Sequence, residues 1–457
     1  MKFTRLIKKK VKTDILVIGS GSAGSTAAIA AAKSNYKISL LERYGFPGGT
    51  STQMLDTFYG FFTPSEYPKK IVGGIPDQVV NELDKSGDVF LRPNTYGAGT
   101  GINYNPERLK HVWDQLLIRS GVDVFYHTTL VGVEKTGEQT HCVFFHKAEG
   151  FFSVVAKRII DASGDADYCY WAGLKYETAG EQDPAQSMTT TFRIANVNLK
   201  KFKEAGGKKL LKALMKEAFE SKTHPLPRKE GSAHEMNIPG CVSTVAVKVV
   251  DHDALDIKSL TNAEIEGRRQ SYVFEKFFRE EVPGFKNSKI ITLSNQIGVR
   301  ETRRVYGNYR LTKDDCISGK KFHDQVLLCG APIEDHRNSG NGSSETFWQY
   351  IPNGGTYGVP YRTLLPQGSD VAWVAGRCFS ATHDAHASCR SMGQTMSMGQ
   401  AAGLAAVLSL ETDSNAEELA VNELQNRLIS IGAVLEEPGE IADVSRNGWV
   451  NNLSKQK

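Results

Sequence analysis

The sequence predicts an α/β protein that combines a parallel sheet, a β-meander and an inserted α+β domain. Three observations support this prediction. The apolar stretch 14–19 runs into a Gly-rich turn, an Ala-rich helix and a second apolar stretch, 37–42, which is the pattern of a βαβ unit. Short strands separated by turn residues follow between 122 and 156, as in a meander. A late apolar stretch, 370–376, precedes a helix of small residues at about 392–410, so distant pieces of the chain build the first domain.

The remaining elements follow from hydrophobic periodicity and from turn residues. Residues 43–66 are rich in Gly, Thr, Ser and aromatic side chains and predict a loop. The predicted helices are 71–85, 106–120, 200–222 and 416–431, and the predicted strands are 122–126, 130–134, 142–146, 151–156, 158–162 and 288–293. The predicted domains are 1–176 and 346–411 for the two parts of the sheet domain, 177–345 for an inserted substrate domain, and 412–457 for a helical tail.

Length and composition limit the classes of protein to consider. At 457 residues the chain is long enough for two or three compact units. A net charge of +4, from 55 basic and 51 acidic residues, gives no reason to expect a nucleic-acid partner. The seven cysteines form no CxxC pair, which argues against a disulfide framework and a zinc knuckle. No apolar run approaches the roughly 20 residues of a membrane span, and no signal peptide is visible, so we expect a soluble, cytoplasmic protein and leave a homo-oligomer open.

A dinucleotide-binding fingerprint stands between the first predicted strand and helix. It reads Gly19-Ser20-Gly21-Ser22-Ala23-Gly24. Two of its glycines allow a tight turn and a close approach to a pyrophosphate, and the third allows close helix–strand packing. The helix N-terminus then presents free N–H groups to the phosphates. Glu42 ends the second strand, where a carboxylate accepts hydrogen bonds from an unphosphorylated ribose, so the pattern favours FAD or NAD over NADP.

Further segments favour FAD over NAD. A second glycine pair, Gly48-Gly49, follows Glu42 and allows another backbone approach to the cofactor phosphates. The strand end at 161–165 is similar to the Ala-Thr-Gly strand end of flavoproteins, and a late Gly-Arg pair precedes the small-residue helix. The predicted cofactor-binding residues beyond the fingerprint and Glu42 are Arg43, Gly48, Gly49, Thr50, Ser51, Leu130, Val131, Ala162, Ser163, Gly164, Asp165, Gly376, Arg377, Met392, Gly393, Gln394 and Thr395.

With these motifs, the chain resembles the FAD-dependent oxidoreductases of the glutathione-reductase-like, two-dinucleotide-binding-domain flavoprotein superfamily. The resemblance is carried by the motif Ala-Gly-Arg-Cys-Phe-Ser-Ala-Thr at 375–382, with Phe379 inserted before the hydroxyl residue, and by the stretches 298–307 and 359–366. It spans residues 14 to about 435 and implies a Rossmann-like FAD-binding domain. It also implies that Gly376 and Arg377 lie near the ribityl side of the cofactor and that the helix from Met392 points its N-terminus at the flavin ring. A helix dipole would stabilise the negative charge of a reduced flavin.

Four residues are candidate catalytic groups. His383 and His386 fall between the two late flavin motifs, and either could take a proton as hydride leaves. Arg390 could hold a carboxylate or stabilise an oxyanion, and Arg300 belongs to an arginine-rich stretch that suits either an anion or an ion-paired scaffold. The alternative for the histidines is a purely structural hydrogen-bonding role. A metal site is not expected, because the histidine pair lacks a clear third ligand.

The sequence therefore predicts an FAD-dependent dehydrogenase or oxidase that moves a hydride from a C–H beside O or N of a small organic substrate to flavin N5. One alternative is a flavin-dependent reductase of an activated C=C bond, and another is a flavin-binding redox sensor. An NAD-dependent dehydrogenase would give a colourless protein. The chain has no second Gly-rich fingerprint for a nicotinamide, so the electron partner is left open between oxygen, a small carrier and another protein.

Overall fold

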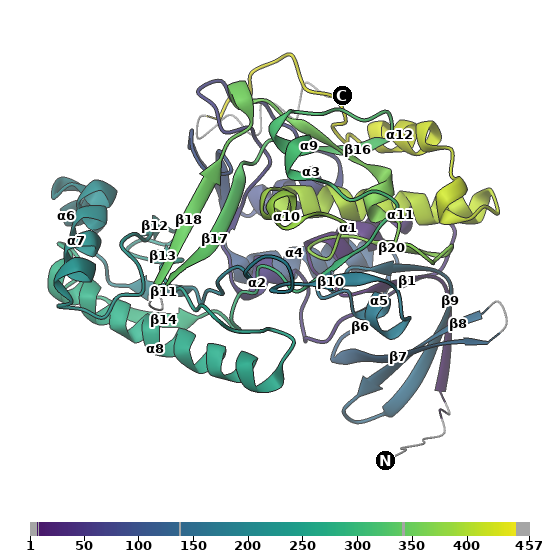
Figure 1. Cartoon of the computed structure of the whole chain (residues 1–457), viewed down its shortest axis with the longest axis horizontal. Coiled ribbons are helices and arrows are strands. Elements are labelled where there is room, and N and C mark those ends of the chain that lie inside the picture. The colour runs from purple at the N-terminus through teal and green to yellow at the C-terminus, as the bar shows by residue number, and fades with distance from the viewer. Residues whose placement is uncertain (1–6, 8, 137–138, 341–342, 445–457) are drawn as a thin grey trace.

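The central feature of the computed structural model is a seven-stranded sheet with the order β6-β2-β1-β9-β8-β7, to which β20 adds by pairing with β9. The structure describes residues 7, 9–136, 139–340 and 343–444, so parts of the predicted first segment and residues 445–457 of the predicted tail lie outside it. The parallel strands are β1 (Lys9–Ile18), β2 (Ile38–Leu41), β6 (Asp123–Phe125), β9 (Gly150–Asp161) and β20 (Ala372–Val374), and the meander adds β7 (Thr128–Thr136) and β8 (Gln139–His146). This is the predicted α/β fold class, with a Rossmann-like parallel sheet and a meander (Figure 1).

β9 is one strand where the sequence predicted two, at 151–156 and 158–162. Its first half pairs antiparallel with β8, and its last residues, Ile159–Asp161, pair parallel with β20. One continuous strand therefore joins the meander to the parallel sheet. Its other edge pairs with β1 along most of its length.

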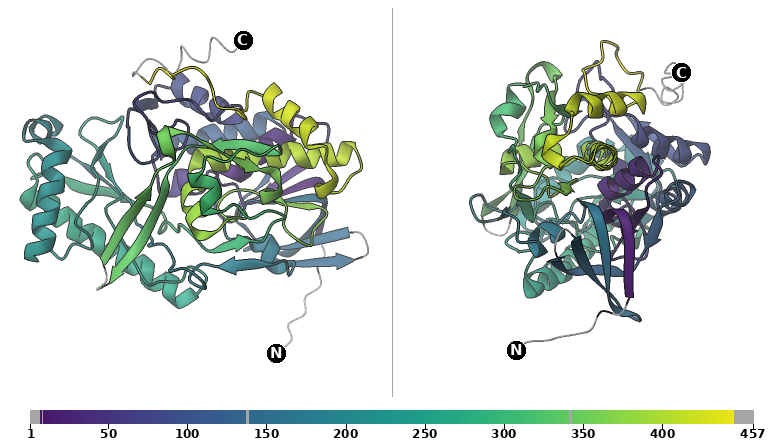
Figure 2. Two further views of the ribbon diagram at one scale, coloured as in Figure 1. Left: turned by 45° about the horizontal axis from the view of Figure 1, so that its top comes forward. Right: turned by 90° about the vertical axis from the view of Figure 1, so that its right-hand side faces the viewer.

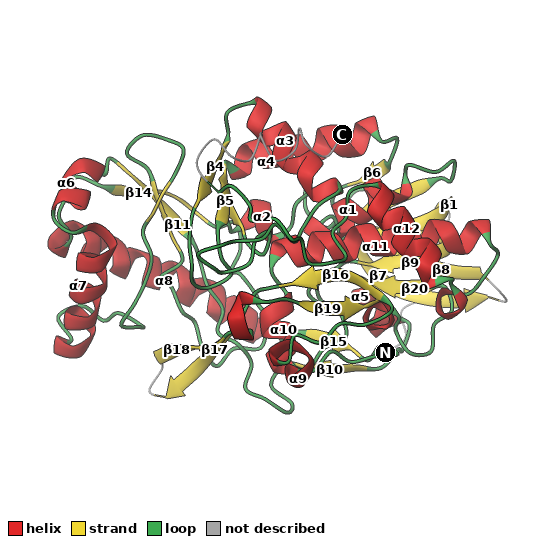
Figure 3. Cartoon of the chain, turned by 90° about the horizontal axis from the view of Figure 1, so that it is seen from above, coloured by secondary structure: helices red, strands yellow, loops and turns green. Residues whose placement is uncertain are grey.

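Two helices of small residues cover the sheet. α1 (Ser22–Ala31) follows β1 directly and is buried along its whole length, and α11 (Met392–Glu411) is buried up to Ser409. α11 crosses α1 so closely that a Cβ at Gly399 would overlap the Ala23 carbonyl oxygen and one at Gly403 would overlap the Ala27 carbonyl oxygen. Small side chains are what allow the two helix backbones to approach this closely (Figure 3).

The segment predicted as a loop at 43–66 contains short regular elements. α2 (Thr50–Gln53) and β3 (Thr57–Phe58) form within it, and β3 joins a small antiparallel sheet. The other strands of this small sheet and the two helices that pack on α1 are β4 (Val89–Arg92), β5 (Gly101–Tyr104), α3 (Ile75–Lys85) and α4 (Pro106–Arg119).

A second hydrophobic core lies away from the main sheet, between Met188 and Ile297. Its aromatic centre includes Phe274, Phe277 and Phe278 from one long helix. Its elements are β11 (Phe192–Ala195), β12 (His234–Glu235), β13 (Val242–Thr244), β14 (Lys289–Leu293), α6 (Leu199–Glu204), α7 (Gly207–Ser221) and α8 (Ile257–Glu281), drawn in teal at the left of Figure 1. The helix predicted at 200–222 is broken, because Gly206 has a φ of 118° between α6 and α7.

The remaining elements link this insert to the sheet domain. β17 (Ile333–Gly340) and β18 (Ser343–Gln349) form a hairpin between the teal insert and the rest of the chain (Figure 2). The others are β10 (Tyr176–Thr178), β15 (Arg303–Val305), β16 (Gln325–Cys329), β19 (Tyr357–Pro360), α5 (Asp167–Trp171), α9 (Lys313–Ile317), α10 (His383–Cys389) and α12 (Val421–Ser430), with short 3₁₀ turns at Pro352–Gly354, Tyr361–Leu364 and Ala416–Glu418. Buried residues from Leu311 to Ala331 pack in the main core and not in the core of the insert. The domain boundary at 345 remains a prediction. In the described part of the chain, none of the helices has the length and apolar character needed to cross a membrane.

Candidate functional site

The fingerprint turn joins the end of β1 to the start of α1. Gly19 has a φ of 89°, and its N–H donates to the Leu41 carbonyl at 2.8 Å. A Cβ at Gly24 would overlap the Gly19 carbonyl oxygen, so this glycine is required by packing alone. Gly21 differs, because a Cβ there would meet no atom within 4 Å. The protein itself gives no packing reason for a glycine at position 21, which leaves space for a ligand at this point of the turn.

Glu42 stands at the end of β2 and is only 5% exposed. One carboxylate oxygen accepts hydrogen bonds from the N–H and the hydroxyl of Ser20, at 2.7 and 2.8 Å, and the other accepts from the Tyr44 N–H at 3.0 Å. A carboxylate has about four lone-pair positions, so further acceptance is available. Glu42 therefore holds the fingerprint turn in place and keeps an oxygen available beside it.

The second glycine pair lies against the fingerprint. Gly48 forms a parallel bridge with Gly21, and a Cβ at Gly49 would approach the Gly21 Cα to 2.8 Å. The hydroxyls of Ser22 and Ser51 are 3.4 Å apart. The structure thus brings the start of α1 and the start of α2, which begins at Thr50, side by side, as two backbone turns around one phosphate group would require.

A charged group lies where β9 ends. Asp165 accepts a hydrogen bond from Arg377 at 2.7 Å and from the Thr302 hydroxyl at 2.9 Å, and Arg43 lies 3.4 Å away. Burial alone would raise the pKa of Asp165, but the two arginines hold it below its ordinary value. Among the described residues, Arg377 Nη1 is buried and has no hydrogen-bond partner. This orphaned donor fits an anionic or hydroxyl-bearing ligand next to Gly164, whose Cβ would lie 3.1 Å from the same guanidinium.

The remaining predicted cofactor residues flank these turns. A Cβ at Gly19 would approach the Ala162 carbonyl oxygen to 2.7 Å, and one at Gly376 would approach the Ala23 Cβ to 3.1 Å. Ser163 donates its N–H and its hydroxyl to Asp161. Leu130 and Val131 lie at an irregularity of β7, where the register with β8 shifts between Leu130 and Gly132. Val131 therefore has no partner in the strand register, which leaves its backbone outside the regular ladder.

α11 begins against the aromatic loop that follows β3. The Gly393 N–H donates to the Tyr59 carbonyl at 3.0 Å, and the Gln394 amide donates to the Gly60 carbonyl at 2.9 Å. Thr395 donates its hydroxyl to the Met392 carbonyl within the first turn. In the described structure Gln394 Oε1 is buried without a hydrogen-bond partner. The start of α11 is thus firmly positioned and carries an unused acceptor.

The two candidate histidines have different environments. His383 is 6% exposed and lies between two carboxylates, with Nδ1 at 3.0 Å from Glu301 Oε1 and Nε2 at 3.2 Å from Asp335 Oδ1. His386 is fully buried, and its Nε2 lies 2.8 Å from the Arg377 carbonyl oxygen. Burial, followed by the charge of Arg304, holds the pKa of His386 well below its ordinary value. A neutral His386 donates to the Arg377 carbonyl, so it links α10 to the late Gly-Arg motif.

The two candidate arginines both donate hydrogen bonds to residues of the segment 186–189. Arg300 Nη1 donates to the Ser187 carbonyl and to the Thr189 hydroxyl, the latter at 2.8 Å. Arg390 Nη2 donates to the Gln186 side chain at 2.9 Å and to the Glu334 carbonyl at 3.3 Å. Burial, followed by the charge of Arg390, lowers the pKa of Arg300 to about 9. The structure therefore places the two guanidiniums near each other, and Arg390 stands two residues before α11 begins.

Sequence reasoning missed Lys248, Glu334 and His336, which lie beside these arginines. Lys248 is 1% exposed, and its Nζ lies 2.6 Å from His336 Nδ1. His336 Nε2 lies 3.1 Å from Glu334 Oε1. Lys248 belongs to no motif and had no signal of its own. The run of titratable residues at 334–337, directly after the apolar stretch 331–333, was a signal that could have been used.

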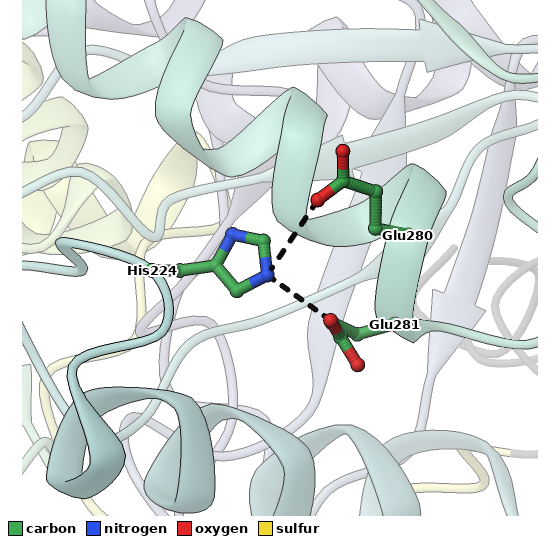
Figure 4. A group of neighbouring side chains, drawn as sticks. All are labelled: His224, Glu280 and Glu281. Atoms are coloured by element: carbon green, nitrogen blue, oxygen red, sulfur yellow. Dashed lines mark hydrogen bonds and ion pairs between the residues drawn. The ribbon is translucent and has the colours of Figure 1, made fainter.

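A histidine and two glutamates lie close together at the end of α8. The candidate ligand atoms of His224, Glu280 and Glu281 all lie within 4.8 Å of one another, and His224 Nε2 is 3.1 Å from Glu281 (Figure 4). Both glutamate side chains are about half exposed. The group belongs to the insert and not to the turns described above, and its contacts are those of a histidine that is hydrogen-bonded to a carboxylate at a helix end.

Comparisons with known proteins give relatives among flavoenzymes. The chain is 27% identical over 211 residues to digeranylgeranylglycerophospholipid reductase of Thermoplasma acidophilum, a match that covers 41% of this chain and about half, 48%, of that protein. Among solved structures, p-nitrophenol 4-monooxygenase from Pseudomonas putida is similar over 98% of this chain and 89% of its own, with 10% identity and a TM-score of 0.47. A geranylgeranyl bacteriochlorophyll reductase-like protein from Thermoplasma acidophilum is similar over 98% and 96%, with 13% identity and a TM-score of 0.44.

A sequence profile of one family covers nearly the whole chain. The profile described as FAD dependent oxidoreductase matches residues 14–428. This range includes the fingerprint turn, the end of β9, the late Gly-Arg motif and the start of α11. The chain therefore belongs to the FAD dependent oxidoreductase family, with FAD as its cofactor.

Proposed function

We propose that the enzyme transfers a hydride from a C–H beside O or N of a small organic substrate to N5 of its FAD. When bound, FAD supplies the hydride acceptor. The observation that carries the proposal is the meeting of Arg300 and Arg390 beside the start of α11, which the family resemblance puts at the flavin ring. These side chains would orient the substrate. Other side chains of the protein would accept the proton that the O or N of the substrate loses together with the hydride.

We propose that the cofactor contacts the same residues that were predicted from the sequence. The open space at Gly21 fits a phosphate group, the unpartnered Arg377 Nη1 fits the ribityl chain, and the shifted register at Val131 fits the adenine ring. Glu42 would bind the adenosine ribose. The combination of a parallel sheet with the β7-β8 meander supports the finer assignment to the glutathione-reductase-like superfamily.

The four proposed catalytic residues have separate roles. His383, with one ring nitrogen at Glu301 and the other at Asp335, is suited to relaying a proton between these two carboxylates, one of which would receive it from the substrate. His386 would position the Arg377 carbonyl and thereby the late motif. Arg300 and Arg390 would bind the substrate or stabilise developing negative charge on it.

A reductase that works in the opposite direction is the second candidate. The relative from Thermoplasma acidophilum is named a reductase, and its match with this chain spans about half of that protein. The same site would then deliver hydride to an activated C=C bond. Addition of substrate would reoxidise a prereduced flavin in this case and would leave an oxidised flavin unchanged.

The test is anaerobic mixing of the FAD-loaded protein with hydroxy acids, amino acids, alcohols, amines and enoates while the flavin absorbance is followed. We expect bleaching by a compound with a C–H beside O or N, and about 100-fold slower bleaching by the same compound in His383→Gln, because general acid–base catalysis contributes on this scale. His323→Gln, at an exposed histidine, is the matched control and should bleach at the wild-type rate. Equal rates in His383→Gln and wild type would remove the proton-relay role.

A further inference from the structure

A group of basic side chains surrounds a carboxylate beside the start of α11. We call Arg228, Lys248, Arg300, His336 and Arg390 the basic cluster, and the carboxylate is that of Glu334. Lys248 and His336 are 1% and 6% exposed, whereas Arg228, Arg300 and Arg390 are part-buried. The three arginines therefore keep some exposed surface, whereas the lysine and the histidine have almost none.

The backbone between Gln186 and Thr189 brings the cluster together from distant parts of the sequence. Met188 forms a bridge with Val249, next to Lys248, and Thr189 forms a bridge with Gly298, near Arg300. The Ser187 N–H donates to the His336 carbonyl at 3.1 Å. Gln270 fixes Lys248 from the other side, because its amide exchanges hydrogen bonds with the Lys248 N–H and carbonyl at 3.0 and 2.9 Å. The cluster is thus held by main-chain pairing and is built into the fold.

The charges of the cluster are not balanced within the protein. Burial, and then the charges of Arg300 and Arg228, hold the pKa of Lys248 well below its ordinary value, and the carboxylate of Glu334 opposes this shift. Glu230 and Asp335 act on Arg228 and Arg390 from neighbouring segments, but Asp335 is also engaged by Arg337 and His383. Buried cations close to one another destabilise the protein unless an anion compensates them.

Two donors of the cluster are unused. In the part of the chain that the structure describes, Arg228 Nε and Arg390 Nε are buried and have no hydrogen-bond partner. Buried N–H groups of arginine are normally satisfied, because leaving them unpaired costs free energy. Unpaired donors on two guanidiniums, beside a surplus of positive charge, point to an anionic ligand.

We propose that the basic cluster binds a carboxylate of the substrate, so that the enzyme acts on a small organic acid. This inference rests on the proposed hydride transfer and names its substrate class. The planar guanidiniums of Arg300 and Arg390 match a carboxylate in two-point contacts. Arginine side chains bind phosphate in the same two-point manner, so inorganic phosphate is the competing ligand in the test. The position of Arg390, two residues before α11, keeps the bound acid beside the proposed flavin site.

The test measures binding of unreactive anions to the FAD-loaded protein by calorimetry and by the flavin difference spectrum, with acetate, malonate, inorganic phosphate and the neutral malonamide as probes. We expect saturable binding of malonate and no binding of malonamide. In Arg300→Gln and Arg390→Gln the malonate Kd should rise about tenfold to 100-fold, the range for a hydrogen bond to a charged group. Arg119→Gln, which removes a surface arginine on α4, should bind malonate like wild type.

Arg300→Lys keeps the positive charge and loses the paired N–H donors of the guanidinium. Its malonate Kd should therefore lie between those of wild type and Arg300→Gln. Malonate binding that is unchanged in both glutamine variants would overturn the proposal, as would phosphate binding without carboxylate binding. Flavin reduction by neutral alcohols or amines, with no carboxylate binding, would overturn the substrate class and leave the hydride transfer standing. Malonate binding without flavin reduction by any acid would overturn the hydride transfer and leave the carboxylate site standing.

Discussion

Gly21 and Gly24 belong to the same fingerprint, but the structure assigns them different physical roles. Gly21 has a φ of −59°, which any residue adopts, and its Cβ would meet no atom within 4 Å. We expect Gly21→Ala to weaken FAD binding by at least about tenfold, because the methyl group would occupy space left for the pyrophosphate. The FAD-free protein should be as stable as wild type, as checked by thermal unfolding beside the FAD titration.

Gly24→Ala is the matched comparison for that experiment. Its Cβ would overlap the Gly19 carbonyl oxygen, so the FAD-free protein itself should lose stability, by about 1 to 3 kcal/mol. If Gly21→Ala also destabilised the FAD-free protein, or if it bound FAD as tightly as wild type, the space at position 21 would not be the pyrophosphate site.

His386 gives a prediction on pH at the residue scale. Its pKa lies well below the ordinary value when the chain is folded, so below about pH 6.5 the unfolded chain binds a proton that the folded chain does not. This histidine therefore lowers the free energy of unfolding as the pH falls, by about 1.4 kcal/mol per pH unit. His386→Phe lacks this contribution and loses the hydrogen bond to the Arg377 carbonyl. Urea denaturation should find the variant less stable at pH 7, with a gap that narrows between pH 6.5 and 5.5. A gap that stays constant would contradict a buried neutral imidazole.

At the scale of elements, the contact between α1 and α11 positions the start of α11, where we propose that the flavin ring binds. Gly403→Ala would force a methyl group into the Ala27 carbonyl oxygen and separate the two helices. We expect a loss of about 1 to 3 kcal/mol in the free energy of unfolding, together with weaker FAD binding. Gly439→Ala is the control, because its Cβ would meet no atom within 4 Å, and it should behave as wild type. Unchanged stability in Gly403→Ala would mean that the helices do not depend on this close approach.

The elements that could be predicted are those with a local signal. β1, α1 and β2 follow from the strand–turn–helix pattern, and α4 begins at Pro106, as its first-turn position predicted. β9 was split because Lys157 and Arg158 interrupt its apolar pattern, although sheet pairing on both edges carries the strand through them. α2 and β3 were missed because four and two residues are too short for periodicity, and tertiary contacts decide such elements.

At the scale of the whole molecule, the turns proposed to bind the cofactor have a signal in the sequence, and the basic cluster has none. The fingerprint, Gly48-Gly49 and the late Gly-Arg pair each have a spacing that has meaning within a short stretch of sequence. Lys248 and His336 are far apart in the chain and meet only because the 186–189 backbone pairs with both of their segments. Charged residues that are far apart in the chain form no recognisable pattern in a single sequence, even when they meet in the fold. His383 shows the same limit, since its partners Glu301 and Asp335 come from two other segments.

The most direct measurement is anaerobic flavin bleaching by small organic acids that carry a C–H beside O or N, such as 2-hydroxy and 2-amino acids. The account predicts that at least one such acid bleaches the FAD of the wild-type protein, that deuterium at the reacting carbon slows the bleaching, and that the amide of the same acid bleaches it far more slowly. A flavin that no compound of the panel reduces, in protein that retains FAD, would contradict the account.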